Sequence, residues 1–111
     1  MNNPKFQIFK SAANSQYYYR LKAVNGETIL GSEGYTSKQN CTNAIASVNA
    51  NAPYDSRYER KDGLTSYTFN LKTNNGEIIG KSEPYTIRVA RENGIAAVKR
   101  YALIAGVEDL T

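Results

Sequence analysis

Hydrophobic and polar residues alternate along two short stretches of the chain. In residues 17–22 the apolar positions are Tyr17, Tyr19 and Leu21, and residues 67–72 repeat the same pattern. A period of two is typical of a β-strand with one buried face. Both stretches are therefore predicted to be strands.

An Asn-Gly pair follows each of these strands, which predicts a hairpin at residues 25–26 and again at 75–76. Two loop lengths fit the first hairpin. A two-residue loop would place Lys22 opposite Ile29, whereas a three-residue loop with a left-handed glycine would place Leu21 opposite Ile29. We favour the three-residue loop because it joins two apolar side chains, and the second hairpin allows the same arrangement.

Helical spacing follows each hairpin. Thr36, with Gln39 three positions later, predicts a helix cap and a helix over about 37–50. Thr86 predicts the start of a second, longer helix that extends to about Ala105. The predicted buried faces are Cys41, Ala44, Ile45 and Val48 in the first helix, and Ile87, Ala90, Ile95, Val98, Tyr101 and Ala102 in the second.

A strand pattern also precedes each hairpin, at residues 6–9 and, more weakly, at residues 58–61. Residues 51–56 between the two halves have the composition of a loop. Each half thus reads as three strands and a helix. Helices gathered on one face of a continuous antiparallel sheet make the predicted fold class α+β.

The two halves are also related in sequence. Residues 17–50 and 67–100 align without a gap and share 15 identities in 34 positions. We interpret this as two repeats, 5–52 and 57–111, related by a pseudo-twofold axis. A unit of this size buries too little apolar surface alone, so we expect one domain over residues 1–111 in which the repeats share a core.

The repeated segments resemble a known family. They read YYYRLKAVNGETILGSEGYTSKQNCTNAIASVNANAP and YTFNLKTNNGEIIGKSEPYTIRVARENGIAAVKR. They resemble the motif LKA-x-NGE-x-I…SE-x-Y…NGI-x-SV of the YegP-like family, small bacterial proteins of unknown function, and depart from it at residues 43–45 and Thr73. The resemblance implies a sheet in which repeats exchange C-terminal strands, here from residues 107–110 and 54–57, and it implies no activity.

Composition limits the classes of function. Hydrophobic residues make up 41% and charged residues 22%, enough for one modest core. No apolar run reaches the length of a membrane span, and the opening residues lack a signal-peptide stretch, so we expect a cytoplasmic protein without a membrane partner. With one cysteine and no histidine, disulfide and zinc scaffolds are excluded. We expect Cys41 to be buried and inert, no cofactor, and no enzyme activity.

Charge suggests where a partner would bind. The net charge is +4, and the basic surplus lies mostly in the first half. Strand alternation turns one set of side chains away from the predicted helices: Tyr18, Arg20, Lys22 and Leu30 in the first repeat, and Thr68, Asn70, Lys72 and Ile78 in the second. Tyr18, Arg20, Lys22 and Lys72 are our candidate binding residues, and single-stranded nucleic acid is the alternative function that they suggest.

Several polar positions are identical in both repeats and have no evident role in the predicted core: Glu27 and Glu77, Ser32 and Ser82, Glu33 and Glu83, Asn43 and Asn93. We favour a structural role for them, and the functional interpretation is a symmetric pair of polar sites. An approach of Glu33 to Glu83 would make a carboxylate-based enzyme the remote alternative. The leading prediction is a monomeric, non-enzymatic binding or structural module, with pairing through sheet edges left open.

Overall fold

The computed structural model describes residues 3–111, so the first two residues of the predicted 1–111 domain lie outside it. Three strands and a helix occur twice in succession, and one more strand follows. The elements are β1 (Lys5–Lys10), β2 (Tyr17–Lys22), β3 (Thr28–Gly31), α1 (Lys38–Asn51), the 3-10 turn η1 (Asp55–Arg57), β4 (Tyr58–Asp62), β5 (Tyr67–Lys72), β6 (Ile78–Lys81), α2 (Arg88–Tyr101) and β7 (Gly106–Asp109).

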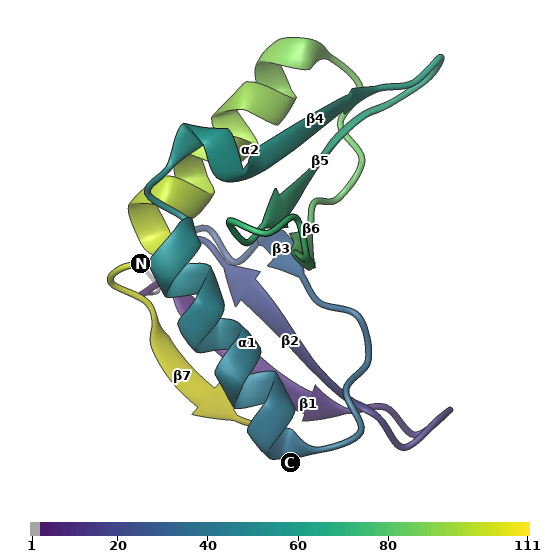
Figure 1. Cartoon of the computed structure of the whole chain (residues 1–111), viewed down its shortest axis with the longest axis vertical. Coiled ribbons are helices and arrows are strands. Elements are labelled where there is room, and N and C mark those ends of the chain that lie inside the picture. The colour runs from purple at the N-terminus through teal and green to yellow at the C-terminus, as the bar shows by residue number, and fades with distance from the viewer. Residues whose placement is uncertain (1–2) are drawn as a thin grey trace.

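The strands form one sheet in the order β4-β5-β6-β3-β2-β1-β7. Helix α1 packs against β1, β2, β5 and β6, and α2 against β3 and β5. Figure 1 shows β7, the last strand, beside β1, the first. The α+β prediction is confirmed, but a wholly antiparallel sheet is wrong, because β7 runs parallel to β1 after α2. Neither helix within residues 3–111 is long and apolar enough to cross a membrane.

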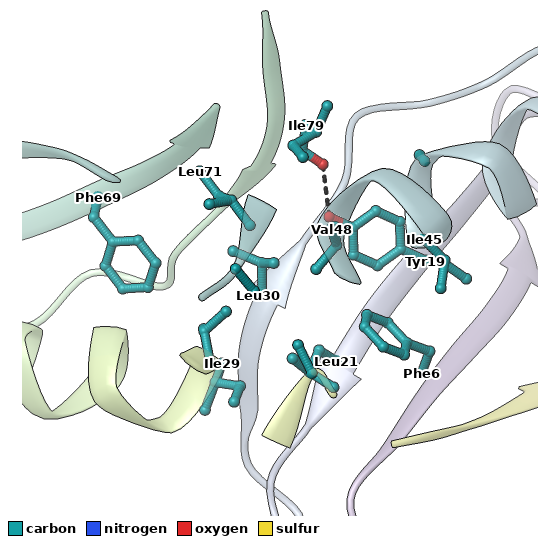
Figure 2. Close-up of a cluster of buried hydrophobic side chains, with 14 of the residues drawn as sticks. Phe6, Tyr19, Leu21, Ile29, Leu30, Ile45, Val48, Phe69, Leu71 and Ile79 are labelled. Atoms are coloured by element: carbon teal, nitrogen blue, oxygen red, sulfur yellow. Dashed lines mark hydrogen bonds between the residues drawn. The ribbon is translucent and has the colours of Figure 1, made fainter. Parts of the chain in front are cut away.

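The core lies between the sheet and the helices and includes residues of both halves (Figure 2). Leu30 is fully buried where β3 meets β6. Its aligned position in the second half is Gly80, where a Cβ would overlap the Leu30 side chain and the Tyr19 hydroxyl. That hydroxyl donates a hydrogen bond of 2.6 Å to the carbonyl of Ile79. One leucine thus fills the space between the halves because its counterpart has no side chain.

The predicted three-residue hairpin loops are present. The amide of Ala23 donates to the carbonyl of Glu27, and the amide of Gly26 donates to the carbonyl of Ala23, each at 2.9 Å. Gly26 has a φ of +83° and Gly76 has +90°, the left-handed conformation that this loop needs.

The predicted pairing of Leu21 with Ile29 is wrong by one residue. A β-bulge at Ile29 places Leu21 opposite Leu30, and the second hairpin likewise places Leu71 opposite Gly80. Because a bulge adds one residue to one strand, Ile29 and Leu30 can both face the core. The prediction that Leu30 faces outward is therefore also wrong, since its side chain is fully buried.

The helix starts differ from prediction. Ser37, not Thr36, is the N-cap of α1, and its hydroxyl accepts a hydrogen bond of 3.1 Å from the amide of Asn40. In α2 the N-cap position is Ile87, not Thr86, and no side chain caps it. Ile87 is also 58% exposed, because it precedes the helix and so lies off its buried face.

Both helices contain 14 residues, so the longer second helix is not found. α2 ends at Tyr101, because the chain must turn before β7 begins at Gly106. Residues 54–57 form a 3-10 turn where a strand was predicted, since β4 begins at Tyr58. Of the other predicted positions, Cys41, Ala44, Ile45 and Val48 in α1 and Ile95, Val98 and Ala102 at α2 are buried, whereas Ala90 and Tyr101 are only partly buried. Arg91 and Gly94 in α2 are buried although neither was predicted to be.

Candidate functional site: two grooves between the halves

The predicted binding residues Tyr18 and Arg20 lie on the helix-free face of the sheet and contact their neighbours. The Tyr18 ring stacks on Phe9, with ring centroids 5.6 Å apart. The Arg20 guanidinium lies 4.6 Å from the centroid of the Phe9 ring, and its Nε donates a hydrogen bond of 2.7 Å to Gln7. These side chains form an ordered row on the sheet.

The other two predicted binding residues differ from each other. Lys72 forms an ion pair of 2.8 Å with Glu59, and Asn70 donates to the same carboxylate. Within residues 3–111, Lys22 has no ion-pair partner. Ile78 faces outward as predicted and is 38% exposed. The four candidates share one face without converging on a pocket.

Ser32 and Ser82 have a structural role. Each hydroxyl accepts a hydrogen bond of 2.9 Å from a strand amide, that of Tyr19 or of Phe69. Each serine amide donates back to the carbonyl of the same residue. The two serines therefore fasten the chain leaving β3 and β6 to the neighbouring strand, which explains their repetition.

Glu33 and Glu83 have separate surroundings. Glu33 forms an ion pair of 2.9 Å with Lys81. Glu83 lines a hollow together with Glu27 and Tyr85. The two carboxylates lie apart because the chains continue in opposite directions beyond the antiparallel Gly31–Lys81 pair of β3 and β6.

Four of the repeated polar residues, Glu27, Glu77, Asn43 and Asn93, instead line two grooves, each built from both halves. The larger groove, which we call the Tyr85 groove, has a volume of about 490 Å³ and lies between the first hairpin and α2. Glu27 stands on the hairpin side, and Tyr85 and Asn93 on the other. Its lining comprises Ala23, Val24, Asn25, Glu27, Ile29, Tyr85, Ala90, Asn93, Gly94, Ala97 and Tyr101.

The smaller groove, which we call the Tyr35 groove, has a volume of about 360 Å³ and lies between the second hairpin and α1. Glu77 stands on its hairpin side, and Tyr35 and Asn43 on the other. Its lining comprises Tyr35, Asn40, Asn43, Ala44, Ser47, Thr73, Glu77 and Ile79. The same tyrosine, asparagine, glutamate and isoleucine positions thus occur in both grooves with the halves exchanged.

Backbone hydrogen bonds hold the groove residues in place. Tyr35 exchanges two hydrogen bonds of 2.8 Å with Tyr17, and Tyr85 pairs in the same way with Tyr67. Glu27 follows the left-handed glycine of the first hairpin, and its amide donates to the side chain of Asn25 at 3.0 Å. The tyrosines and glutamates are therefore fixed at their backbones, while their side chains reach the groove.

The grooves collect unpaired negative charge. Within residues 3–111, three carboxylates form no ion pair: Glu27 in the Tyr85 groove, Glu77 in the Tyr35 groove, and Glu83 in the hollow that it shares with Glu27 and Tyr85. The other seven of the ten acidic residues are ion-paired: Glu33, Asp55, Glu59, Asp62, Glu92, Glu108 and Asp109.

Burial and the nearby carboxylates affect the pKa of the two groove tyrosines. Burial, followed by the charge of Glu27 and then Glu83, raises the pKa of Tyr85. Burial also raises the pKa of Tyr35, with smaller contributions from Cys41, Glu77 and Glu33. Both phenols are therefore neutral at physiological pH and can donate or accept a hydrogen bond.

The two grooves differ in how far their polar groups are already engaged. In the Tyr35 groove, Asn43 accepts a hydrogen bond of 2.9 Å from Gln39, and the nearby Glu33 is paired with Lys81. In the Tyr85 groove, the Asn93 side chain forms no hydrogen bond within the described residues. The Tyr85 groove thus has more binding capacity for a ligand.

Cys41 lies outside both grooves. It is fully buried in the core, and burial raises the pKa of its thiol to about 11. A thiol with that pKa is protonated at neutral pH and unreactive. No cluster of three metal-binding side chains occurs in the part of the chain that the structure describes.

Tyr35 and Tyr85 are the groove residues that the sequence interpretation missed. Both are identical between the repeats but were not among the predicted site residues, and both are only partly buried. The signal that could have found them is the repeated Ser-Glu-x-Tyr-Thr string, in which the tyrosine follows a polar segment rather than a strand pattern.

A family model described as a domain of unknown function, DUF1508, matches residues 12–59 and 65–109. The chain belongs to the DUF1508 family. Among curated relatives of this DUF1508 protein, YegP of Yersinia pestis is 56% identical over 52 residues, which cover 47% of this chain and 46% of the relative. YegP of Escherichia coli K12 is 54% identical over 56 residues, half of each chain.

The DUF1508 fold is also found in two solution NMR structures. The UPF0339 protein SO3888 of Shewanella oneidensis is 40% identical, with a TM-score of 0.91 over 98% of this chain and 92% of that one. YegP of E. coli, described as a protein of unknown function, is 44% identical, with a TM-score of 0.91 over 100% and 96%. The matched segment spans about half the length of the curated relatives. No specific activity is established for the family.

Proposed function

We propose that this protein is a non-enzymatic binding module whose ligand site is the Tyr85 groove. The observation that carries the proposal is that Glu27 and Tyr85 line both this groove, which also contains Asn93, and an adjoining hollow that contains Glu83. Within residues 3–111, neither of the two carboxylates is engaged in an ion pair. Surface carboxylates in a basic protein ordinarily find a basic neighbour, as the other seven acidic residues here do.

The chemistry of the groove favours an organic cation. Two carboxylates attract a positive charge, and the face of an aromatic ring adds a cation–π contact. The apolar side chains of Ile29 and Ala97 suit the methylene chain that carries such a charge. A primary ammonium or a guanidinium on a short aliphatic chain therefore fits, whether from a free amine or from a lysine or arginine side chain.

The proposal includes a pseudo-twofold arrangement of two tandem repeats that form one domain, a pseudo-dimer in a single chain. It is supported by the constant offset of 50 between aligned residues and by the paired bridges Tyr17–Tyr35 and Tyr67–Tyr85. The parallel contact of β7 with β1 supports a strand exchanged from the second repeat to the first. Both grooves then depend on both repeats, so neither repeat would bind ligand alone.

Absence of catalysis is part of the same proposal. The chain has no histidine, and the pKa of its only thiol is raised to about 11. Glu33 and Glu83, the carboxylate pair considered for acid–base chemistry, have different neighbours. The cytoplasmic location and the monomeric state remain predictions, which cell fractionation and light scattering would test.

The test is a titration of the ¹⁵N-labelled protein with n-butylammonium, n-butylguanidinium and a short lysine peptide, followed by NMR chemical shifts. We expect shifts at the amides of Glu27, Tyr85 and Asn93 with either cation. The uncharged butanol and the anionic butyrate should cause none. A response to the peptide alone would identify the source of the cation as a protein side chain.

Two isosteric variants make the test specific. Glu27→Gln and Glu83→Gln each remove one charge, and we expect about fivefold weaker binding, the size of one exposed charge contact. Glu92→Gln, which removes a carboxylate outside the groove, should bind like the parent protein. Shifts confined to other regions, or equal affinity in all three variants, would refute the proposed site.

A further inference from the structure

The helix-free face of the sheet, which we call the outer face, carries a separate feature. Its side chains alternate with the buried ones along each strand. Its basic residues are Lys5, Arg20, Lys22, Lys61, Lys72 and Lys81, and its acidic residues are Glu59 and Glu108.

The outer face holds the whole charge excess of the protein. Six basic and two acidic strand residues leave a surplus of four positive charges, which equals the net charge of +4. The remaining surface is therefore balanced. Such a one-sided distribution attracts polyanions to one face.

The basic side chains of the outer face differ in whether an ion pair neutralises them. Lys72 is paired with Glu59, and Lys81 at the end of β6 is paired with Glu33, which lies in the loop after β3. Within residues 3–111, Arg20 and Lys22 form no ion pair. Both lie on β2, so the least neutralised charge sits on the first half of the sheet.

Aromatic rings lie next to these free charges. Phe9 and Tyr18 stack across β1 and β2 with an interplanar angle of 15°, and both are only partly buried. Arg20 is held in place by the Phe9 ring and by Gln7, whose own amide donates a hydrogen bond of 2.6 Å to Glu108. A fixed guanidinium beside exposed ring surface is an arrangement that contacts a phosphate and a base together.

We propose that the outer face binds single-stranded nucleic acid, with Lys22 and Arg20 at phosphates and Tyr18 against an unpaired base. The charge of the face complements a phosphate backbone, and only unpaired bases can stack on a side-chain ring. This site lies on the opposite side of the sheet from the core and the helices. It therefore does not depend on the grooves.

The experiment measures fluorescence anisotropy of a labelled oligothymidylate of about 12 nucleotides, long enough to cross several strands. We expect binding that weakens more than tenfold between about 50 and about 200 mM salt, because each phosphate contact releases counterions. A duplex of the same length should bind at least fivefold more weakly. No binding at the lower salt concentration would overturn the proposal.

Matched variants separate the outer face from general attraction. Lys22→Glu and Arg100→Glu change the net charge equally, but Arg100 lies on α2. We expect Lys22→Glu to weaken binding at least fivefold and Arg100→Glu less than twofold. Equal effects of the two variants would refute the outer face as the site.

Stacking needs its own pair of variants. Tyr18→Leu keeps an apolar side chain at the position and removes the ring, and Tyr54→Leu does the same at an exposed tyrosine near η1. We expect at least threefold weaker binding for Tyr18→Leu alone. If Tyr18→Leu has no effect and heparin competes as well as the oligonucleotide does, the face binds polyanions in general and the proposal is wrong.

Discussion

The two halves of the molecule fill the same place in their helices in opposite ways. In α1 the position belongs to Cys41, which is fully buried among apolar side chains. In α2 it belongs to Arg91, which is only 3% exposed. Arg91 donates hydrogen bonds to Asp62, to Glu92 and to the carbonyl of Lys61. A buried charge is tolerated there because its donors have acceptors, so each half depends on its own neighbours rather than on the aligned residue.

The two ends of the sheet differ in how their charged side chains are paired. Within residues 3–111 the outermost strands are β4 at one end and β7, beside β1, at the other, and each pairs with a strand on one side only. Charged side chains gather at the β4 end: Asp55 contacts Arg60 and Lys99, and Arg60 also contacts Glu92. Charge on an edge strand disfavours pairing with another chain. Ion pairs occur at both ends, since Lys5 contacts Glu108 and Lys38 contacts Asp109 at β7, but among the described residues only the ion pairs at the β4 end share partners.

The largest loss of stability is expected when the arginine of α2 is placed at the aligned position of α1. Cys41→Arg would bury a guanidinium among apolar atoms, and we expect it to lower the free energy of unfolding by about 4 kcal/mol or more. Urea denaturation followed by circular dichroism measures this. Cys41→Ala, which only removes volume, should cost about 2 kcal/mol. If Cys41→Arg is no worse than Cys41→Ala, the surroundings of α1 accept a charge and the contrast between the halves is false.

A second prediction concerns Leu30 and Gly80, which share the space between the halves. Leu30→Ala should cost about 3 kcal/mol by leaving a cavity, and Gly80→Ala about 2 kcal/mol by overpacking. The double variant should cost at least about 1 kcal/mol less than the two together, because the new methyl group occupies part of the cavity. Strict additivity in denaturation experiments would show that the two positions do not compete for one space.

These positions also show what the sequence could and could not predict. Alternation and the repeated Asn-Gly pairs were enough for the strands, the three-residue loops and the α+β class. The bulges at Ile29 and Ile79 were not predictable from alternation, because both neighbours of Ile29 are compatible with a regular strand. Leu30 was therefore assigned to the wrong face.

The candidate site was harder to predict than the fold. Identity between the repeats drew attention to Glu27, Asn43 and their partners, although a structural role was the favoured interpretation. It could not show that the hairpin of one half faces the helix of the other, because that contact depends on the order of strands in the sheet. Thr36 and Ser37 illustrate the same limit locally, since either hydroxyl suits a cap and backbone geometry selects Ser37.

A third, smaller change in stability should distinguish the two ends of the sheet, and it depends on pH and on salt concentration. Hydrogen bonds from Arg60 and then Lys99 lower the pKa of Asp55 to about 2, whereas Thr111 is the largest cause that lowers the pKa of Asp109 to about 2. Both folded-state pKa values lie below the unfolded value of about 3.9, so each contribution to stability is complete above that pH and is lost as pH falls toward 2.

Asp55→Asn and Asp109→Asn should therefore each flatten the loss of stability between about pH 4 and about pH 2. Added salt should reduce the contribution of Asp55 more, because its partners are charged whereas the largest partner of Asp109 is a neutral hydroxyl. Thermal melts over this pH range, at low and high salt, measure both effects. Equal salt sensitivity of the two variants would contradict the assignment of Thr111, rather than Lys38, as the main partner of Asp109.

The smallest change in stability is expected at Gly94, the position in α2 that aligns with Ala44 in α1. A Cβ at Gly94 would overlap the hydroxyl and the ring of Tyr85. Gly94→Ala gains up to about 1 kcal/mol of helix propensity, and displacing the tyrosine side chain offsets that gain, so the net change should stay within about 1 kcal/mol. The tyrosine should nevertheless move, and cation binding in the Tyr85 groove should weaken.

The matched variant in the other groove is Ala44→Gly, which removes a methyl group beside Tyr35 and forces nothing to move. It should lower the free energy of unfolding by about 1 kcal/mol and leave the Tyr85 groove unchanged. Aromatic chemical shifts of Tyr85, measured with the denaturation midpoints, separate the two results. If Gly94→Ala leaves the Tyr85 chemical shifts unaltered, α2 has room for the methyl group that α1 already carries at Ala44. Close packing of Tyr85 against α2 would then not distinguish the two grooves.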